Sequence, residues 1–210
     1  MLGVPIEKAT AADAKAVADI YQDRPTNNFN RLSHGNVSPS VFNAGLEAMF
    51  AESLQDPNEL LLVYRDESHP ERKVETIAAR AKYEARVMPG MNGPLLVEMW
   101  EKLDRMAEKI MAGRGPYWMV DNVGTLQSHQ RRGIASALIR ASFEECTGLP
   151  IYLDTSGDED ARAWRLYERL GFQIVAEFEI DLVKHGGEGA HKHFGMLREP
   201  RVATGRPWLS

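Results

Sequence analysis

The chain has 210 residues, of which 43% are hydrophobic and 26% are charged, and this ordinary composition excludes fibrous and disordered proteins. A chain of this length suits one well-buried core, so we predict a single domain over residues 1–210. The formal net charge of −5 excludes the broad basic field that recruits nucleic acid or anionic lipid, and we expect neither nucleic acid nor a membrane as a partner.

Strand and helix patterns alternate through the N-terminal half, about residues 1–116. Apolar residues recur at helical spacing after Thr10 and Asp13, either of which could cap that helix. They recur again within 95–111, and because Gly and Pro punctuate the surrounding stretch we interpret it as an insertion over one edge of a sheet. The other elements predicted here are a strand at 4–8, a first helix ending at Pro25, a loop at 26–40, a helix at 41–54, and strands at 59–64 and 73–86.

The pattern is clearest in the next segment, about residues 117–183. Strand and helix periodicities alternate there in the order βαβαβ, which favours an α/β fold. The predicted elements are a strand at 117–125, a turn at 126–131, a helix at 132–145, a strand at 151–155, a helix at 161–170 and a strand at 173–183. A last strand near 191–198 belongs to the C-terminal part, 184–210.

A glycine-containing turn, QRRGIA at Gln130 to Ala135, joins the first of these strands to its helix. The phosphates of a nucleotide need several converging N–H donors, and the first turn of a helix supplies them because its amides lack intrahelical acceptors. Gly133 lets the backbone approach closely. We predict that an anion binds to the backbone amides of this turn, namely those of Arg131, Arg132, Gly133, Ile134, Ala135 and Ser136, with added charge from the two arginines.

The alternative is a surface turn that only starts a helix, since short glycine motifs recur by chance. The context favours anion binding, because the turn follows an apolar strand and opens a helix with an apolar stripe of Ile134, Leu138 and Ala141. A dinucleotide-binding oxidoreductase is disfavoured because the spacing G-x-G-x-x-G is absent.

These residues resemble the GNAT acetyltransferase superfamily, whose signature Q/R-x-x-G-x-G/A follows a central strand. Gln130, Gly133 and Ala135 match that signature, and a second family block matches in LYERLGF at 166–172. The ending MLREP at 196–200 is similar to the close of many small fungal members. The resemblance implies a single GNAT-like α/β domain with a central mixed, mostly antiparallel sheet of about 6–7 strands flanked by helices.

The resemblance also implies acetyl-CoA as the co-substrate, with its pyrophosphate in the QRRGIA turn and Val123 and Thr125 facing the pantetheine arm. The acceptor is then a primary amine of a small molecule or a peptide, and the acidic net charge agrees with a cationic acceptor. The alternative is a non-catalytic acyl-CoA-binding or regulatory module with the same fold. The identity of the acceptor and the oligomeric state stay open.

Acyl transfer from a thioester to an amine needs a neutral amine, a polarised carbonyl and a proton for the departing thiolate. In the family pattern a backbone amide near Val123 to Thr125 polarises the carbonyl. Tyr167 stands where family members place the phenol that protonates the thiolate, and a phenol of reference pKa ~10 can protonate a thiolate whose reference pKa is ~8.5. The alternative for Tyr167 is a packing role in the core.

Two carboxylates are candidates for the general base. Asp121 precedes Val123 and Thr125 on the predicted strand, so strand alternation predicts that the three side chains share a face. Asp154 ends the next strand, where open α/β sheets bind ligands. Either carboxylate could instead accept a hydrogen bond from a backbone N–H or pair with an arginine, and a water chain is the third option.

Histidines gather near the end of the chain. His191 and His193 alternate on the last predicted strand and therefore face the same way, and His185 precedes the turn before it. A metal site needs a third ligand, so we expect no metal, and we predict that His191 and His193 line the acceptor pocket.

The single cysteine, Cys146, excludes an intrachain disulfide, and its place in a helical pattern indicates packing rather than reactivity. The N-terminus lacks a basic region followed by an apolar one, and no apolar run has the length that spans a bilayer. We expect a soluble cytoplasmic protein, with a nuclear location not excluded.

Overall fold

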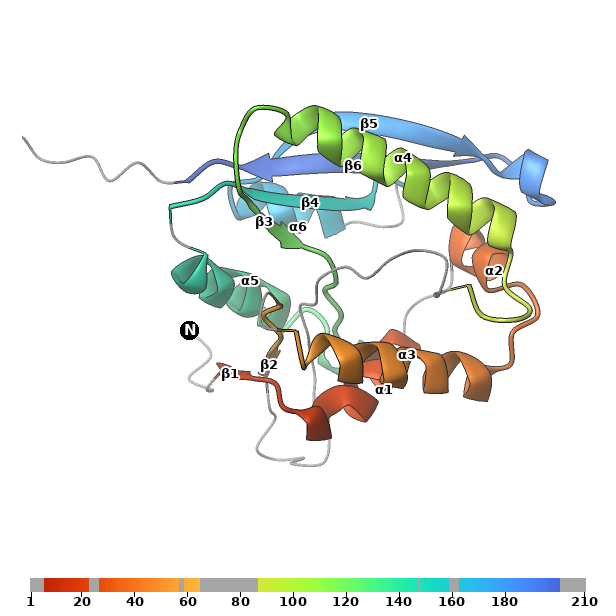
Figure 1. Ribbon diagram of the computed structural model, residues 1–210, viewed down its shortest axis with the longest axis horizontal. Helices are drawn as coiled ribbons and strands as arrows, with labels where there is room; N and C mark the ends of the chain where they lie inside the picture. The colour runs from red at the N-terminus through yellow and green to blue at the C-terminus, as the bar shows by residue number, and fades with distance from the viewer. Residues whose placement is uncertain are drawn as a thin grey trace, which may run out of the picture.

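The computed structural model describes residues 6–22, 27–56, 59–64, 87–146, 148–158 and 163–200 (Figure 1). In chain order these ranges contain β1 (Ile6–Lys8), α1 (Ala14–Gln22), α2 (Asn28–His34), α3 (Pro39–Ser53), β2 (Leu62–Tyr64), α4 (Gly93–Met111), β3 (Trp118–Val120), α5 (Ile134–Glu145), β4 (Ile151–Ser156), α6 (Ala163–Arg169), β5 (Gln173–Asp181) and β6 (Ala190–Arg198). Short 3-10 turns precede α1 (η1, Ala11–Asp13) and α5 (η3, Gln127–His129) and follow β5 (η4, Leu182–His185). The strand predicted at 73–86 lies outside the described residues.

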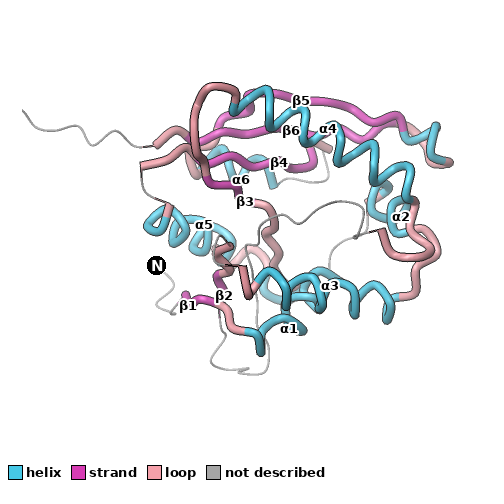
Figure 2. Tube along the Cα trace, viewed as in Figure 1, coloured by secondary structure: helices cyan, strands magenta, loops and turns pink. Residues whose placement is uncertain are grey.

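The described strands form two sheets (Figure 2). β1 and β2 pair antiparallel, and a four-stranded sheet has the order β3-β4-β6-β5. In the larger sheet β3 and β4 are parallel, whereas β4–β6 and β5–β6 are antiparallel. The predicted α/β fold with a mixed, mostly antiparallel sheet is therefore confirmed, as is the βαβαβ order from β3 to β5.

Helices cover both faces of the four-stranded sheet. On one face, Leu153 of β4 lies in an apolar cluster with Ile139 of α5 and Tyr167 of α6, and we call this the α6 face. On the other face, Tyr152 of β4 packs in a cluster with Met111 of α4, and we call this the α4 face. Successive strand residues point to opposite faces, so the register of β4 and β6 assigns every other side chain to one of these two faces.

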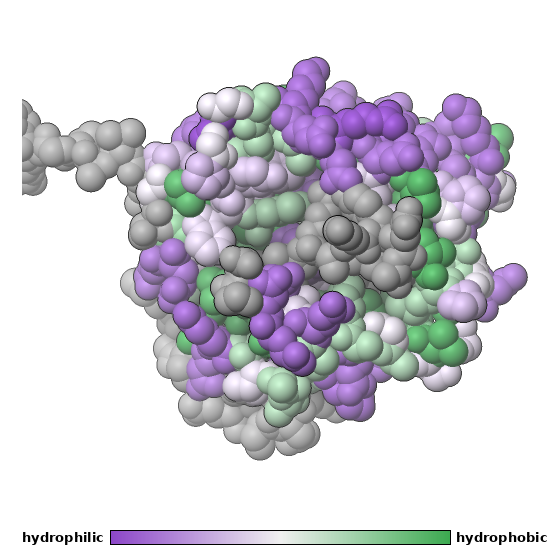
Figure 3. Space-filling model, in the orientation of Figure 1, coloured by the Kyte–Doolittle hydropathy of each residue, from purple (hydrophilic) through white to green (hydrophobic). Residues whose placement is uncertain are grey.

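The position predicted for α4, over one edge of the sheet, is wrong, because the helix crosses a face (Figure 1). Its buried stripe runs the length of the helix, so it contacts β5 near its start and β4 and β6 near its end. The stripe consists of Leu95, Leu96, Met99, Leu103, Met106 and Met111, all of them buried. Hydrophilic side chains gather over the outer side of α4 (Figure 3).

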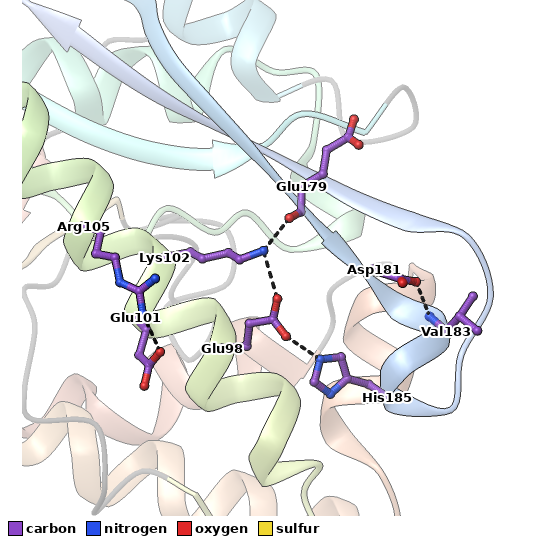
Figure 4. A network of polar contacts seen from close by, with 8 residues as sticks. All are labelled: Glu98, Glu101, Lys102, Arg105, Glu179, Asp181, Val183 and His185. Atoms are coloured by element: carbon purple, nitrogen blue, oxygen red, sulfur yellow. Dashed lines mark hydrogen bonds and ion pairs between the residues drawn. The ribbon is translucent and has the colours of Figure 1, made fainter.

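Glu98 joins α4 to the hairpin of β5 and β6 (Figure 4). Its carboxylate lies 2.9 Å from Lys102 Nζ and 2.8 Å from His185 Nε2, which is in η4. Lys102 also donates to the backbone carbonyl of Glu179 in β5 at 2.7 Å. The hydrogen bonds from Lys102 and His185 hold the pKa of Glu98 below its usual range, so its carboxylate stays charged. These contacts hold α4, β5 and η4 together.

The loop predicted at 26–40 is also wrong, because α2 lies within it. The polar residues that favoured a loop are helix caps: the Asn27 side chain accepts from the backbone N–H of Asn30, and the Ser38 side chain accepts from that of Val41. Pro39 then begins α3, where its missing N–H costs nothing. As a result α2 covers the end of the sheet at which β5 and β6 turn (Figure 1).

Candidate active site

The parallel strands β3 and β4 part after three residue pairs. Val120 and Leu153 are the last pair, and β4 then continues to Ser156, paired among the described strands with β6. Residues 121–126 form neither helix nor strand. We call the point just beyond Val120 and Leu153 the strand opening.

Both candidate carboxylates lie at the strand opening, because Asp121 and Asp154 directly follow the last pair on their two strands. Asp154 is 15% exposed, and its Oδ1 lies 3.1 Å from Nε2 of His193 on β6. It falls on the α4 face, since it is two residues beyond Tyr152 on the same strand.

The strand predicted at 117–125 is too long, because β3 ends at Val120. Val123 packs against the same α6-face cluster as Val120, whereas strict alternation puts two residues three apart on opposite faces. The period of two therefore stops at Val120, and the alternation from which Asp121, Val123 and Thr125 were predicted to share a face does not hold.

The QRRGIA turn curls the backbone around one point. Arg131 has φ +62° and Gly133 has φ +81°, both in the left-handed region, and such residues turn successive N–H groups toward one concave side. Holding a non-glycine residue there costs about 1–2 kcal/mol, which is typical of functional turns. Gly133 is the N-cap of α5, which begins two residues later than predicted, and the amides of Ile134, Ala135 and Ser136 belong to its first turn.

Neighbouring residues fix this turn in place. Gln130 closes the loop before it, because its side-chain amide donates to the backbone carbonyl of Thr125 at 3.2 Å. Ile134 is buried in a cluster with Leu62 of β2, so the start of α5 rests on the smaller sheet. The side chains of Arg131 and Arg132 are both exposed at the surface beside this turn.

Tyr167 lies on the α6 face, opposite Asp154. It is 7% exposed and packs edge to face with Phe172 at a centroid distance of 6.0 Å. Its cluster includes Val120 and Leu153, the pair that borders the strand opening. The predicted acid and one of the predicted bases therefore flank the opening from opposite faces of the sheet.

His193 and His191 continue the contact of Asp154 along β6. Nδ1 of His193 lies 3.3 Å from Nε2 of His191, and Nδ1 of His191 lies 2.7 Å from Oδ2 of Asp158, in the loop after β4. The two histidines share a face as predicted, while His185 pairs with Glu98 instead. Burial lowers the pKa of His191, with a smaller contribution from His193, and Asp158 acts in the opposite direction, so the neutral imidazole is favoured.

Two aromatic rings cover these histidines, and sequence reasoning did not single out either ring. Phe29 of α2 stacks on His191 at a centroid distance of 4.2 Å, and Phe178 of β5 stacks on His193 at 5.4 Å. Asp158 was missed as well, although its place just beyond β4 could have indicated a ligand-side carboxylate. Phe29 carried no such signal, because it fell in the predicted loop.

A cavity of about 650 Å³ lies away from the strand opening. It is lined by residues of the C-terminal ends of α5 and α6, among them Arg140, Cys146 and Arg169. Cys146 follows α5, about 20 Å along the helix from the QRRGIA turn. Burial raises the pKa of its thiol to about 11, so it is poorly suited to carry an acyl group.

In the part of the chain that the structure describes, no group of three or more His, Cys, Asp or Glu side chains is arranged to hold a metal ion. Among the helices of the described ranges, none is both long and apolar enough to cross a bilayer.

Comparison with known proteins places this α/β fold in a family. Residues 18–172 match the family model described as Acetyltransferase (GNAT) family. The match spans more than half of the chain, which therefore belongs to the GNAT acetyltransferases.

Solved structures agree on the fold. A structure described as histone acetyltransferase HPA2 and related acetyltransferase, from Corynebacterium glutamicum, is 21% identical, with a TM-score of 0.59 and coverage of 96% of this chain and 98% of that one. A GNAT superfamily phosphinothricin acetyltransferase from Sinorhizobium meliloti, in complex with AcCoA, is 16% identical, with a TM-score of 0.60 and coverage of 95% and 89%. The C-terminal condensation domain of Ebony, in complex with beta-alanyl-dopamine, is 13% identical, with a TM-score of 0.66 and coverage of 95% and 100%.

At these identities the likeness concerns the fold alone. The similarity of MLREP to the close of small fungal members finds no support in these matches, two of which come from bacteria.

The thiol of Cys146 should react slowly in the folded protein. With a pKa of about 11, its thiolate fraction at neutral pH is at least ~100-fold smaller than that of an unperturbed cysteine, and labelling by iodoacetamide should slow in proportion. The rate measured in urea is the matched control, since unfolding removes the burial. Equal rates in the folded and unfolded protein would contradict this assignment.

Proposed function

We propose that this acetyltransferase is an N-acetyltransferase, which moves the acetyl group of acetyl-CoA to a primary amine of a small molecule or a peptide. The observation that carries the proposal is the strand opening, flanked by Tyr167 on the α6 face and by Asp154 on the α4 face. An acid for the leaving thiolate and a base for the incoming amine are needed on opposite sides of the acetyl carbon, and this arrangement supplies both.

The residues near the opening fit the co-substrate. The concave QRRGIA turn offers the amides of Arg131 to Ser136 to a pyrophosphate, and Arg131 and Arg132 add positive charge. Val123 and Thr125 lie between that turn and the strand opening, on the path that the pantetheine arm would follow. Gln130 serves this site through its side chain, by closing the loop that carries the turn.

The acceptor arrives as an ammonium ion, because alkyl amines have a pKa near ~10. Asp154 accepts one proton, and the neutral nitrogen forms a bond to the acetyl carbon while the bond from carbon to sulfur breaks. The thiolate takes the phenol proton of Tyr167, and the second proton of the nitrogen restores the phenol. One proton per turnover is thus left over on Asp154. Asp121, beside the same opening, is the second candidate base.

The attack is direct, without an acyl-enzyme. The single cysteine of the chain, Cys146, lies beyond the far end of α5, and burial raises the pKa of its thiol to about 11. A carboxylate at the opening also favours a cationic acceptor over an anionic one. The competing function is a regulatory module that binds acyl-CoA without catalysis.

The direct test measures thiol release from acetyl-CoA with lysine, putrescine, spermidine, tyramine and a lysine-containing peptide, and identifies products by mass spectrometry. Acetylation of at least one amine supports the proposal. CoA binding without turnover of any of them would overturn it and favour the regulatory module.

Replacing Gly133 by Ala should weaken CoA binding by roughly tenfold or more, because alanine disfavours the left-handed conformation that shapes the turn. Gly113→Ala is the matched control, since Gly113 has a positive φ like Gly133 but lies in the turn after α4, with open space around it. Both substitutions should cost about 1 kcal/mol of stability, whereas calorimetry should show weakened binding for Gly133→Ala alone. Equal CoA affinities in the two variants would contradict the assignment of the turn.

Tyr167→Phe should lower kcat by roughly 100-fold or more, because it removes the proton donor for the thiolate and keeps the ring. The dissociation constant for CoA should change less than about twofold, since the phenol acts on the leaving group. Tyr117→Phe, which alters an exposed tyrosine just before β3, should leave both quantities unchanged. A Tyr167→Phe variant with full kcat would assign Tyr167 to packing alone.

A further inference from the structure

Four polar side chains form an unbroken line from the strand opening to the solvent. In order they are Asp154, His193, His191 and Asp158, and the three contacts between them measure 3.1, 3.3 and 2.7 Å. Each imidazole uses both of its nitrogens, one toward each neighbour. A neutral imidazole can donate from one nitrogen and accept at the other, so each ring can pass a proton across itself.

The exposed fraction of the side chain falls from Asp154 to His191 and then rises at Asp158. The side chain of Asp154 is 15% exposed, the histidines are 9% and 2% exposed, and Asp158 is 29% exposed. Phe29 and Phe178 stack on the two rings and exclude water from their faces. The interior of the line is therefore dry, and Asp158 connects its far end to water.

From this geometry we infer that His193 and His191 carry the proton of the acceptor ammonium from Asp154 to Asp158, which releases it to solvent. The inference rests on the proposed function, which leaves one proton per turnover on Asp154. A proton arriving at Nε2 of His193 displaces the Nδ1 proton to His191, whose own Nδ1 proton moves to Asp158. No bond between heavy atoms changes, and the charge of the four groups together is the same before and after the transfer.

The number of protons in the line supports proton transfer along it rather than a purely structural role. Three contacts need three hydrogens, and four arrangements satisfy all of them: a protonated Asp154, a protonated Asp158, or an imidazolium at either histidine with both carboxylates charged. Each arrangement contains the same number of protons, so the excess proton can occupy any position without leaving a contact empty. Burial lowers the pKa of His191, which disfavours the form in which the proton would stay midway.

Within the described ranges, few other charged groups contact this line. Asp158 also accepts from the backbone N–H of Lys192 through Oδ1, which leaves Oδ2 for His191. On the α4 side, the ammonium of Lys102 lies 5.9 Å from the centroid of the Phe178 ring, which stacks on His193. From α2 and β5 the groups that meet the histidines are the uncharged rings of Phe29 and Phe178.

The test compares His191→Gln and Asp158→Asn with the wild type, using the best amine of the panel above. Both substitutions keep hydrogen-bonding groups but break the path. We expect kcat at pH 7 to fall by roughly tenfold or more, with the KM for acetyl-CoA within about twofold. The loss should shrink as the pH rises toward ~9.5, where more of the amine arrives neutral and hydroxide accepts the proton. If the line has a purely structural role, the loss of kcat should be the same at every pH.

His185→Gln is the matched control, because His185 also pairs with a carboxylate, that of Glu98, but lies outside the line. It should retain the wild-type kcat and pH profile. If either line variant fails to fold, the other is decisive, since His191 is in β6 and Asp158 is in a loop.

Chemical rescue of His191→Ala distinguishes proton transfer by the imidazole from simple filling of the space that it leaves. In His191→Ala, added imidazole should restore part of kcat, whereas N-methylimidazole fills the same space but has one ring nitrogen blocked and should not. Proton transfer along the line would be contradicted if His191→Gln and Asp158→Asn had the same kcat as His185→Gln at every pH. Equal rescue by imidazole and N-methylimidazole would contradict it as well. Either result would leave the proposed function intact. A wild type that acetylates no amine overturns the proposed function and the path with it.

Discussion

The two edges of β4 form hydrogen-bonded pairs with their neighbouring strands over different lengths. One edge pairs with β6 over all six residues, from Ile151 to Ser156, while the other pairs with β3 over three. The long antiparallel ladder holds β4 in place, so β3 can leave it after Leu153 without unravelling the strand. Three features of the site follow from that departure: the two aspartates beside the opening, the loop at 121–126, and the later turn into α5.

The departure also separates two environments. Because β4 alternates between faces, Leu153 belongs to the cluster of Tyr167 while Asp154 belongs to the side of α4 and the histidines. The proposed acid, packed among apolar side chains, and the proposed base, joined to buried imidazoles, thus flank one backbone position. A loop could supply the same two groups, but the pleat of a strand holds them on opposite sides without further support.

Periodicity predicted the elements from α5 to β6 within a few residues, because each is long enough to repeat its pattern. It failed where a residue type has two meanings: Asn27 and Ser38 favoured a loop and are in fact helix caps. It also extended β3 to Thr125, since apolar residues continue past the point where β4 stops pairing. The end of a strand depends on its neighbour, and no local pattern encodes it.

Three of the four residues in the line could be predicted from the sequence, but the contacts between them could not. Asp154, His191 and His193 were each singled out from their strands, yet their contact depends on the register of β4 and β6, in which Ser156 faces His193 and Asp154 faces Gly195. Asp158 and Phe29 join through the fold alone. Burying two imidazoles is costly unless both nitrogens are bonded, and here the two carboxylates and the contact between the rings meet that need. Burial also favours neutral His191, the form that donates and accepts at once, so the packing that makes the line stable keeps it ready to pass a proton.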